Sequence, residues 1–439
     1  MGTFVTLGEY NKLYKYIWIS ISLKIVFQYL FGTDFPEEIK IFKKTSFPKN
    51  VLIQEGLNYL GIFIFSIFLF IYEKTQNKSE TDKNIASNNS DSNSSFYKSY
   101  YKYLIYTDFE NIRYSLKPVI ILVLLIIFSD QLRNTFYNLN LKGLDFKMFE
   151  LLFVCIITLL MFKIPIYRHK KVAIGFIIFL CVSMKALSIK YRLIDNHKRR
   201  IFKIYSWIIP VGIFSFILIS LLRSYNFCKA KWLFDLKFIS VSKLLLFYGA
   251  LGSIICLSVS IFPSLFHCRN KESLYNIDFI CNVTDFDSSN NSTSYYYESY
   301  SLYLKNLWRE ERAIYKNFIY LILILIEIIL YFLIKLYSVL IIKNLYPEYL
   351  ICSNLIYYFI IETIDSISCI FLNKFKYYKL YDILDELFSI IGTIFYLELI
   401  EFNFWGLDFD LKKNIKKRSE SESRLGSSIG EESSNPSEY

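Results

Sequence analysis

The stretch FIYLILILIEIILYFLIKLY at residues 318–337 is the most hydrophobic segment of the chain. Its length matches the roughly 20 residues that a helix needs to cross a hydrocarbon core of roughly 30 Å. About ten comparable segments occur between residues 13 and 401. Many of them are apolar on every side, as bilayer-spanning helices are. The sequence therefore predicts an all-α, polytopic membrane protein with ten transmembrane helices.

Hydropathy sets the limits of the expected spans. The segment around 118–129 has an apolar core that is too short to cross a bilayer unless residues 114–117 and 130–132 extend it. The first span follows a short polar tail without a small-residue cleavage site, so we expect a retained span rather than a signal peptide. The expected spans are 13–31, 51–72, 118–129, 148–166, 171–189, 204–222, 240–265, 318–337, 350–372 and 383–402.

The composition excludes several classes of function. The chain has 439 residues, is 54% hydrophobic and has a net charge of +11. Its Lys and Arg residues lie mostly in short loops, where anionic lipid headgroups account for them better than a nucleic acid does. The eight cysteines include no C-x-x-C pair, and no phosphate-binding loop or HExxH motif occurs. We therefore expect neither a metal, a cofactor nor an enzymatic activity.

The spans divide into two groups of five. Spans four and five are joined by the short basic connector YRHKK (167–171), and spans nine and ten by NKFKYYKLYD (373–382). Five spans is an odd number, so the two halves would have inverted topologies, which is a common construction of secondary transporters. The alternative is that short basic loops recur by chance in any ten-span protein.

The expected domains follow from this division. A flexible linker is predicted inside the first half because its composition is rich in Ser, Asn and Lys. The chain would comprise a cytoplasmic tail (1–12), a first five-helix half (13–190, with a disordered linker at 73–98), a second half (204–402, with a long loop at 266–315), and a basic, then Ser/Glu-rich disordered cytoplasmic tail (403–439).

The orientation depends on the tail and on the 266–315 loop, because the loop Lys and Arg residues divide almost evenly. The tail is basic, and ten spans place the loop on the opposite, lumenal or extracellular side. There Cys268 and Cys281 could pair in an oxidising compartment. Sequons mark candidate glycosylation sites at Asn282, Asn290 and Asn291. Sequons also occur in the 73–117 segment, which lies on the other side, so only one set could be used. The membrane would be an endomembrane of Golgi or vacuolar type, or the plasma membrane.

Polar residues inside spans are functional candidates, because a charge at a span centre costs about 2.5–3.5 kcal/mol. Glu327 is the one charge in LILILIEIILYFLI (321–334). The alternative for Glu55, which is near a span end, is an interfacial position. For Lys24 and the other carboxylates the alternative is structural pairing or neutral burial inside the bundle. Asp382, Asp385 and Glu386 begin the last span and are expected at the interface, and Lys185 is expected to reach toward it. The candidates for the substrate or ion path are Lys24, Gln28, Glu55, Asn58, Glu327, Tyr357, Tyr358, Glu362 and Asp365.

Two stretches resemble a known family. IPIYRHKKVAIGFIIFL (164–180) is similar to the turn between the fourth and fifth helices of the drug/metabolite transporter superfamily, and LDELFSIIGTIFYLELIEF (384–402) to its last helix. The resemblance implies that Gly175 and Gly392 are helix-packing glycines. It covers under a tenth of the chain, which is poorer in glycine than the family, with 14 in all. Nucleotide-sugar and triose-phosphate carriers belong to this superfamily, and its vacuolar drug-resistance carriers have a similar long loop.

These observations favour secondary-active transport of a small polar or organic-ion solute by alternating access. The partners would be membrane lipids and the solute, and a buried carboxyl such as Glu327 could carry a coupling proton. We expect Glu327, Glu362 and Asp365 to face a cavity opposite Lys24 and Gln28. The alternative is a multi-pass receptor or scaffold that transports nothing.

Overall fold

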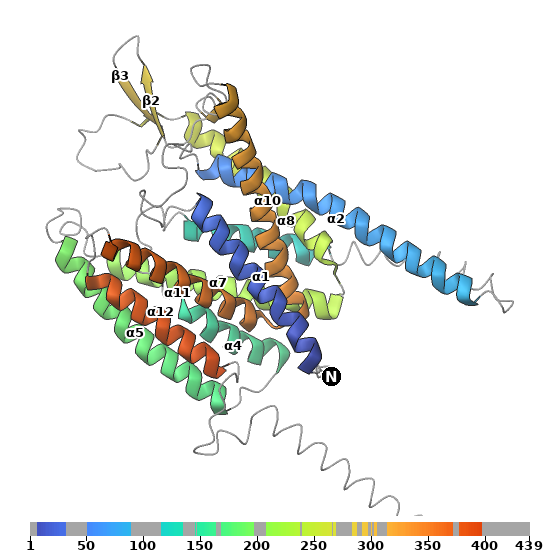
Figure 1. Cartoon of the computed structure of the whole chain (residues 1–439), viewed down its shortest axis with the longest axis horizontal. Coiled ribbons are helices and arrows are strands. Elements are labelled where there is room, and N and C mark those ends of the chain that lie inside the picture. The colour runs from blue at the N-terminus through green and yellow to red at the C-terminus, as the bar shows by residue number, and fades with distance from the viewer. Residues whose placement is uncertain are drawn as a thin grey trace, which may run out of the picture.

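The computed structural model describes most of the helical part of the chain. Figure 1 shows how the described helices and strands are arranged. The described residues are 7–31, 51–88, 116–134, 145, 147–163, 168–196, 208–237, 239–265, 267–268, 283–287, 292–296, 300, 303–304, 314–371 and 377–396.

A helix overlaps each of the ten segments that hydropathy singles out. One of them is the helix at 116–134, which coincides with the weakest predicted span. The others are α1 (Leu7–Phe31), α2 (Val51–Asn88), α4 (Met148–Phe162), α5 (Arg168–Asn196), α7 (Ile208–Lys237), α8 (Val241–Leu265), α10 (Ile314–Asn344), α11 (Pro347–Phe371) and α12 (Tyr377–Tyr396).

Six helices in the described part of the chain are long and apolar enough to cross a membrane, namely α2, α5, α7, α8, α10 and α11. α4 is apolar but has only 15 residues. Large apolar side chains cover the outside of the bundle: Phe179 is 73% exposed and Leu160 is 72% exposed, as side chains facing lipid would be. These features are those of a multi-pass membrane protein.

α2 and α7 extend furthest beyond the segments predicted for them. α2 continues to Asn88 and projects from the bundle in Figure 1, although residues 73–98 are predicted to be a disordered linker. The stretch EKTQNKSETDK contains neither Gly nor Pro, so nothing in it interrupts the helix that the apolar part begins. α7 continues to Lys237 rather than ending near residue 222, so Arg223 lies within the bundle instead of at its edge.

Two pairs of neighbouring helices are antiparallel. α2 lies along α8, with Gly56 against Leu257 at one point and Phe63 against Gly249 further along. α5 lies along α12, with Ile177 against Gly392. Further along α5, Lys185 faces α12 nearer that helix's start. The two helices of each pair are therefore antiparallel.

Two other pairs run in the same direction. α4 lies beside α7: the backbone carbonyl of Glu150 accepts a hydrogen bond from Ser224 at 2.9 Å, and Thr158 contacts Cys228 at 3.6 Å. α1 lies beside α11, where Lys24 donates a hydrogen bond to Asn354 at 2.7 Å. One turn later on both helices, Gln28 accepts a hydrogen bond from Tyr357 at 3.4 Å.

The interior consists of two hydrophobic clusters. The larger joins residues of α1, α2, the 116–134 helix, α7, α8, α10 and α11, and includes fully buried Ile62 and Val123. The smaller joins α4, α5, α7, α11 and α12, and includes Val154 and Cys181. α7 and α11 contribute to both clusters, so these two helices hold the bundle together.

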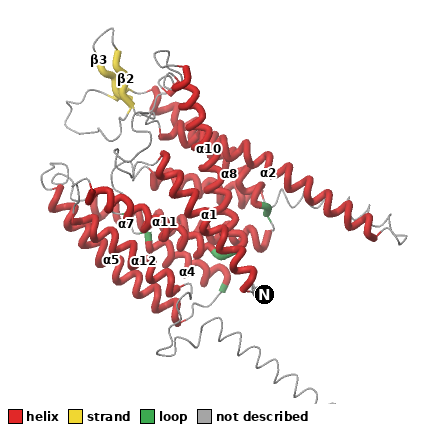
Figure 2. The backbone as a smooth tube through the Cα atoms, viewed as in Figure 1, coloured by secondary structure: helices red, strands yellow, loops and turns green. Residues whose placement is uncertain are grey.

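A small antiparallel sheet lies in the long loop between α8 and α10 (Figure 2). Its strands are β1 (His267–Cys268), β2 (Val283–Asp287) and β3 (Ser292–Tyr296), in the order β1-β3-β2. Sequence patterning did not predict these strands. Cys281, Asn282, Asn290 and Asn291 lie outside the described residues, so the predicted disulfide and glycosylation sites stay predictions.

Candidate functional site

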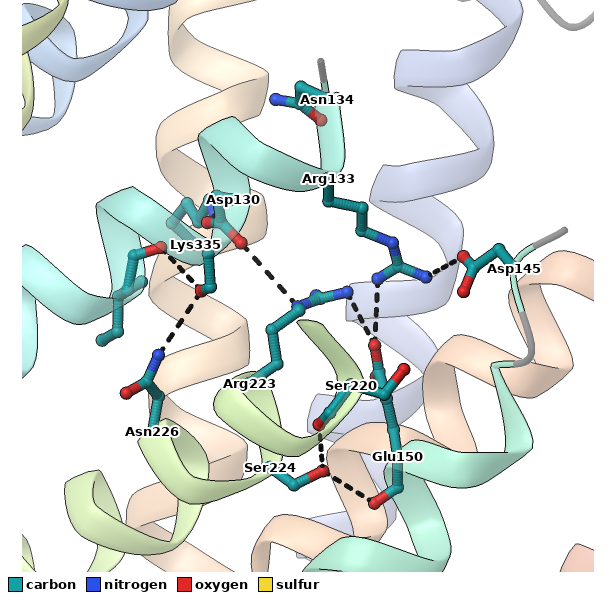
Figure 3. A network of polar contacts seen from close by, with 12 residues as sticks. Asp130, Arg133, Asn134, Asp145, Glu150, Ser220, Arg223, Ser224, Asn226 and Lys335 are labelled. Carbon is teal, nitrogen blue, oxygen red and sulfur yellow. Dashed lines mark hydrogen bonds and ion pairs between the residues drawn. The ribbon is translucent and has the colours of Figure 1, made fainter. Parts of the chain in front are cut away.

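Six charged side chains of alternating sign form a connected network between helices of the bundle (Figure 3). They come from the 116–134 helix, the residues that follow it, α4, α7 and α10. In order, the chain is Lys335, Asp130, Arg223, Glu150, Arg133 and Asp145.

Glu150 is the centre of this network. One of its oxygens accepts hydrogen bonds from Arg223 at 2.8 Å and from Arg133 at 3.0 Å. Arg133 also donates to Asp145 at 2.5 Å. The side chains of Glu150 and Asp145 are only 5% and 1% exposed. Buried ionised groups are tolerated only when paired and hydrogen-bonded, and here both conditions are met.

Asp130 forms the more open end of the network. Lys335 donates a hydrogen bond to its carboxylate at 3.0 Å, and Tyr248 does so at 3.2 Å. Arg223 lies 3.8 Å from the other carboxylate oxygen. The side chain of Lys335 is 25% exposed, more than any other in the network. Lys335 is therefore the least enclosed member of the network.

The network contains three cations and three anions and is neutral as a whole. It joins the 116–134 helix and α4, in the first half of the sequence, to α7 and α10 in the second. Removing one member would leave its partners buried without compensation, which typically costs about 3–5 kcal/mol. The network therefore specifies how these four helices pack.

Glu55, a predicted path residue, lies close to the same region. Both of its carboxylate oxygens accept hydrogen bonds from the 116–134 helix, one from Gln131 and one from Asn134 at 2.5 Å. Beside it, Tyr248 donates a hydrogen bond to Tyr59 at 3.3 Å. The structure thus places Glu55 inside the bundle, with amide partners, rather than at the membrane interface.

Lys24 and Gln28 face α11, as two residues four apart on one helix face can. Lys24 donates to Asn354, and Gln28 accepts from Tyr357. The hypothesis that Lys24 lies opposite the carboxylates is not supported, because the acceptor that the structure gives it is the neutral Asn354. Three of the predicted path residues therefore do come together, on the surfaces that α1 and α11 share.

The predicted carboxylates are divided between two places. Glu327 is 7% exposed and accepts a hydrogen bond from Asn58 of α2 at 3.4 Å, so the inward orientation predicted for it is confirmed. Asp365 instead pairs with Lys379 of α12 at 2.6 Å. Tyr358 and Glu362 lie near Lys147, whose amine is 3.5 Å from the centre of the tyrosine ring. No contact within the described residues joins Glu327 to this second group.

The acidic residues that begin α12 are buried, although an interfacial position was predicted. Asp382, Asp385 and Glu386 are 4–5% exposed. Lys185 lies 3.7 Å from Asp382, and Lys147 lies 2.8 Å from Glu386. Hydropathy failed here because it detects how polar a segment is but not which basic residue a neighbouring helix brings to it.

The two glycines singled out by the family resemblance behave differently. A methyl group at Gly392 would lie 1.9 Å from the Ile177 side chain, so this glycine does permit close packing of α12 on α5. A methyl group at Gly175 would meet nothing within 4 Å. The packing role predicted for Gly175 is therefore wrong, because that residue is on the exposed face of α5.

Sequence reasoning missed the six residues of the ion network. Asp130, Arg133 and Glu150 lie near the ends of predicted spans, where charges are usually solvated, and Lys335 lies near the end of the span predicted at 318–337. The signal that was present is their grouping: oppositely charged residues end the third segment and open the fourth, on either side of one loop.

Models of protein families, curated proteins and solved structures were compared with the chain, and none matches it.

Proposed function

We propose that the chain is a ten-span secondary transporter built from two inverted five-helix halves. α1, α2, the 116–134 helix, α4 and α5 would form the first half. α7, α8, α10, α11 and α12 would form the second. The transported species would be a small polar or organic-ion solute, bound between the halves and released to either side by alternating access.

The pattern of helix pairing is the observation that carries this proposal. The second helices of the two halves pack on each other, α2 with α8, and so do the fifth helices, α5 with α12. The fourth helix of each half lies beside the first helix of the other, as α4 with α7 and α1 with α11. If each helix is replaced by its counterpart in the other half, the same four pairs of neighbours result. A two-fold axis that relates the two halves would require this.

The helix directions support the same arrangement. In ten successive spans, directions alternate, so the pairs α2/α8 and α5/α12 should be antiparallel and the pairs α4/α7 and α1/α11 parallel. The contacts of Gly249 with Phe63 and of Thr158 with Cys228 agree with this requirement. It also follows that the loop carrying the sheet would lie on the side opposite the C-terminal tail, which we place in the cytoplasm.

The substrate would bind between α1, α10 and α11, near Lys24, Gln28, Lys335 and Tyr357. These residues offer two ammonium groups, an amide and a phenol, drawn from both halves. Such a set suits an organic ion or a polar solute better than an apolar one. The resemblance to the drug/metabolite transporter superfamily supports the same general function, in an endomembrane or the plasma membrane.

Glu327 would couple transport to protons. Its carboxyl is buried between α2 and α10, and the partner that the structure gives it, Asn58, is neutral. A carboxyl in such a place can bind a proton and release it when the halves move apart. Because α2 and α10 belong to different halves, that movement would expose it.

A ligand screen followed by counterflow tests this function. Full-length protein is screened for stabilisation by organic anions, cations and zwitterions, and a stabilising compound is then tested for exchange across proteoliposomes. A transporter exchanges the compound, whereas a receptor or scaffold binds it without moving it. Glu327→Gln should leave binding intact and remove the dependence of uptake on a pH gradient, while Glu73→Gln, where the apolar part of α2 gives way to the polar part, serves as the control.

A further inference from the structure

The end of α11 and the start of α12 bring a thiol, an amine and a carboxylate together. Lys379, in the first turn of α12, donates hydrogen bonds to Asp365 at 2.6 Å and to the sulfur of Cys369 at 2.8 Å. Asp365 and Cys369 are four residues apart on α11, so they share one face of that helix. The sulfur also lies 3.9 Å from the carboxylate of Asp365. We call these three residues the Cys369 cluster.

The distance between the nitrogen and the sulfur is the most informative feature of the cluster. Hydrogen bonds from nitrogen to oxygen are mostly about 2.9–3.0 Å long. Sulfur is larger than oxygen, so a distance of 2.8 Å places the amine of Lys379 in close contact with the sulfur of Cys369. Reacting atoms within about 3–3.5 Å of each other are already near the geometry of attack. The amine is therefore positioned to form a bond to this sulfur once the sulfur becomes an electrophile.

The other described cysteines have different surroundings. Cys155 contacts the hydroxyl group of Tyr396 at 3.1 Å, and Cys181 contacts that of Ser389 at 3.1 Å. Of the six cysteines that the structure describes, Cys369 is the one whose sulfur accepts a hydrogen bond from an ammonium group. The contact between thiol and amine is thus a local feature of this cluster rather than a general result of the many lysines.

The cluster is partly exposed and lies at the end of two successive spans. The side chains of Lys379 and Asp365 are 15% and 19% exposed, and Cys369 is 8% exposed. α10 and α11 are each long enough to cross a membrane, and two crossings return the chain to the side from which it entered α10. The cluster then shares a side with the loop that carries the sheet, where Cys268 and Cys281 are predicted to be oxidised.

A buried hydroxyl group beside the cluster has no partner. Ser366 lies one turn before Cys369 on α11 and is only 1% exposed. Its hydroxyl is without a hydrogen-bond partner in the described part of the chain, which is rare for a buried polar group. Residues three apart on a helix are neighbours, so this hydroxyl is in place to bond an oxygen atom attached to the sulfur.

We propose that the Cys369 cluster is a redox site in which oxidised Cys369 is captured by Lys379 as a sulfenamide. Hydrogen peroxide is the oxidant. The sulfur forms a bond to one peroxide oxygen, the O–O bond breaks, and the thiol proton leaves with the other oxygen as water. Lys379 then passes one proton to Asp365, and its nitrogen lone pair attacks the sulfur. The N–S bond forms, the S–O bond breaks, and the hydroxyl leaves as water with a second proton from the nitrogen.

The product is a reversible bond between α11 and α12. The sulfur loses two electrons, the peroxide is reduced to two molecules of water, and Asp365 releases its proton to water. Sulfenic acids condense with nitrogen in this way, and capture protects the sulfur from the irreversible sulfinic and sulfonic acids. One thiol releases the amine by attacking the sulfur, and a second thiol reduces the resulting disulfide. This inference does not rest on the transport function, because a receptor or scaffold would contain the same site.

Mass spectrometry of the full-length protein in lipid vesicles tests the proposal. The protein is treated with hydrogen peroxide and digested with trypsin, which cleaves after Lys374 and Lys376, between the two reacting residues. We expect two peptides joined through Cys369 and Lys379, lighter than their sum by two hydrogen atoms and separated by a thiol reductant. This readout uses the unsubstituted protein, so it does not depend on the folding of a variant. A Cys369 that stays a thiol, or that becomes a sulfinic acid without joined peptides, would overturn the proposal.

Two variants assign the roles. Lys379→Arg keeps a positive charge beside Asp365, but its guanidinium stays protonated and is a poor nucleophile. We expect it to lose the joined peptides and to show more labelling of Cys369 by dimedone, a reagent for sulfenic acids. Cys352→Ser removes another buried thiol of α11 and should leave the joined peptides unchanged. Equal dimedone labelling of Cys369 in the wild type and in Lys379→Arg would refute capture by Lys379.

Discussion

Replacing Gly249 with alanine would force α8 away from α2. The added methyl carbon would lie 2.4 Å from the backbone nitrogen and 2.7 Å from the Cα atom of Phe63, and 2.9 Å from the carbonyl oxygen of Tyr59. Ordinary contacts of a Cβ atom begin at 3.4 Å, so the helices must separate by about 1 Å at this point. The obstructing atoms belong to the backbone and cannot rotate away.

The magnitude follows from this separation. Overpacking a well-packed interior typically costs about 1–3 kcal/mol. A gap of about 1 Å also forfeits up to about half of the dispersion energy of the contacts that it opens. Since α2 and α8 are in contact along most of their shared length, we expect a loss near 3 kcal/mol, the upper end of that range.

Gly175→Ala is the matched control, because it makes the same chemical change where nothing lies within 4 Å. Helix propensity alone would make either alanine variant up to about 1 kcal/mol more stable. Thermal unfolding in one detergent should therefore show a lower midpoint for Gly249→Ala and an unchanged or higher one for Gly175→Ala. Thiol labelling of Cys256, buried on α8, should also be faster in Gly249→Ala. Equal midpoints and equal labelling would refute the proposed contact between α2 and α8.

Three further results are expected. Glu150→Gln should lower the free energy of unfolding by about 3–5 kcal/mol, because two arginines lose their shared anion; a midpoint equal to that of the wild type would contradict this. Gly392→Ala should destabilise the protein, and adding Ile177→Ala should restore part of the loss; additive losses would count against their contact. Cys268 and Cys281 should form a disulfide in protein from a secretory compartment, and free thiols by mass spectrometry would disprove it.

Hydropathy could predict where the helices are, because lipid imposes the same requirement on every span. It also identified Glu327, since a lone carboxyl in an apolar segment must face the interior of the bundle. For Lys24, the sequence predicted the position on the first span but not the hydrogen-bond partner. Its location on α1 was clear from the sequence, but its partner Asn354 is 330 positions away, and no local pattern encodes which distant helix lies beside α1.

The ion network could not be predicted for a related reason. Charges at span ends are usually solvated, so Asp130 and Glu150 resembled ordinary interfacial residues. They are buried because α7 continues past its predicted end and brings Arg223 between them. Family resemblance had a similar limit, since Gly392 packs against a neighbouring helix while Gly175 does not. In each case the missing information is which helix face meets which.

The account depends most directly on whether a residue between the halves can be reached from both sides of the membrane. Asn354→Cys protein in oriented vesicles is exposed to a membrane-impermeant thiol reagent on one side at a time. The unsubstituted protein gives the background, and six of its eight cysteines are buried. We predict labelling from either side. A Thr158→Cys disulfide to Cys228, which joins α4 to α7 where these side chains are 3.6 Å apart, should then restrict labelling to one side. Labelling from the same single side with and without the disulfide, or from neither, would contradict alternating access by two halves.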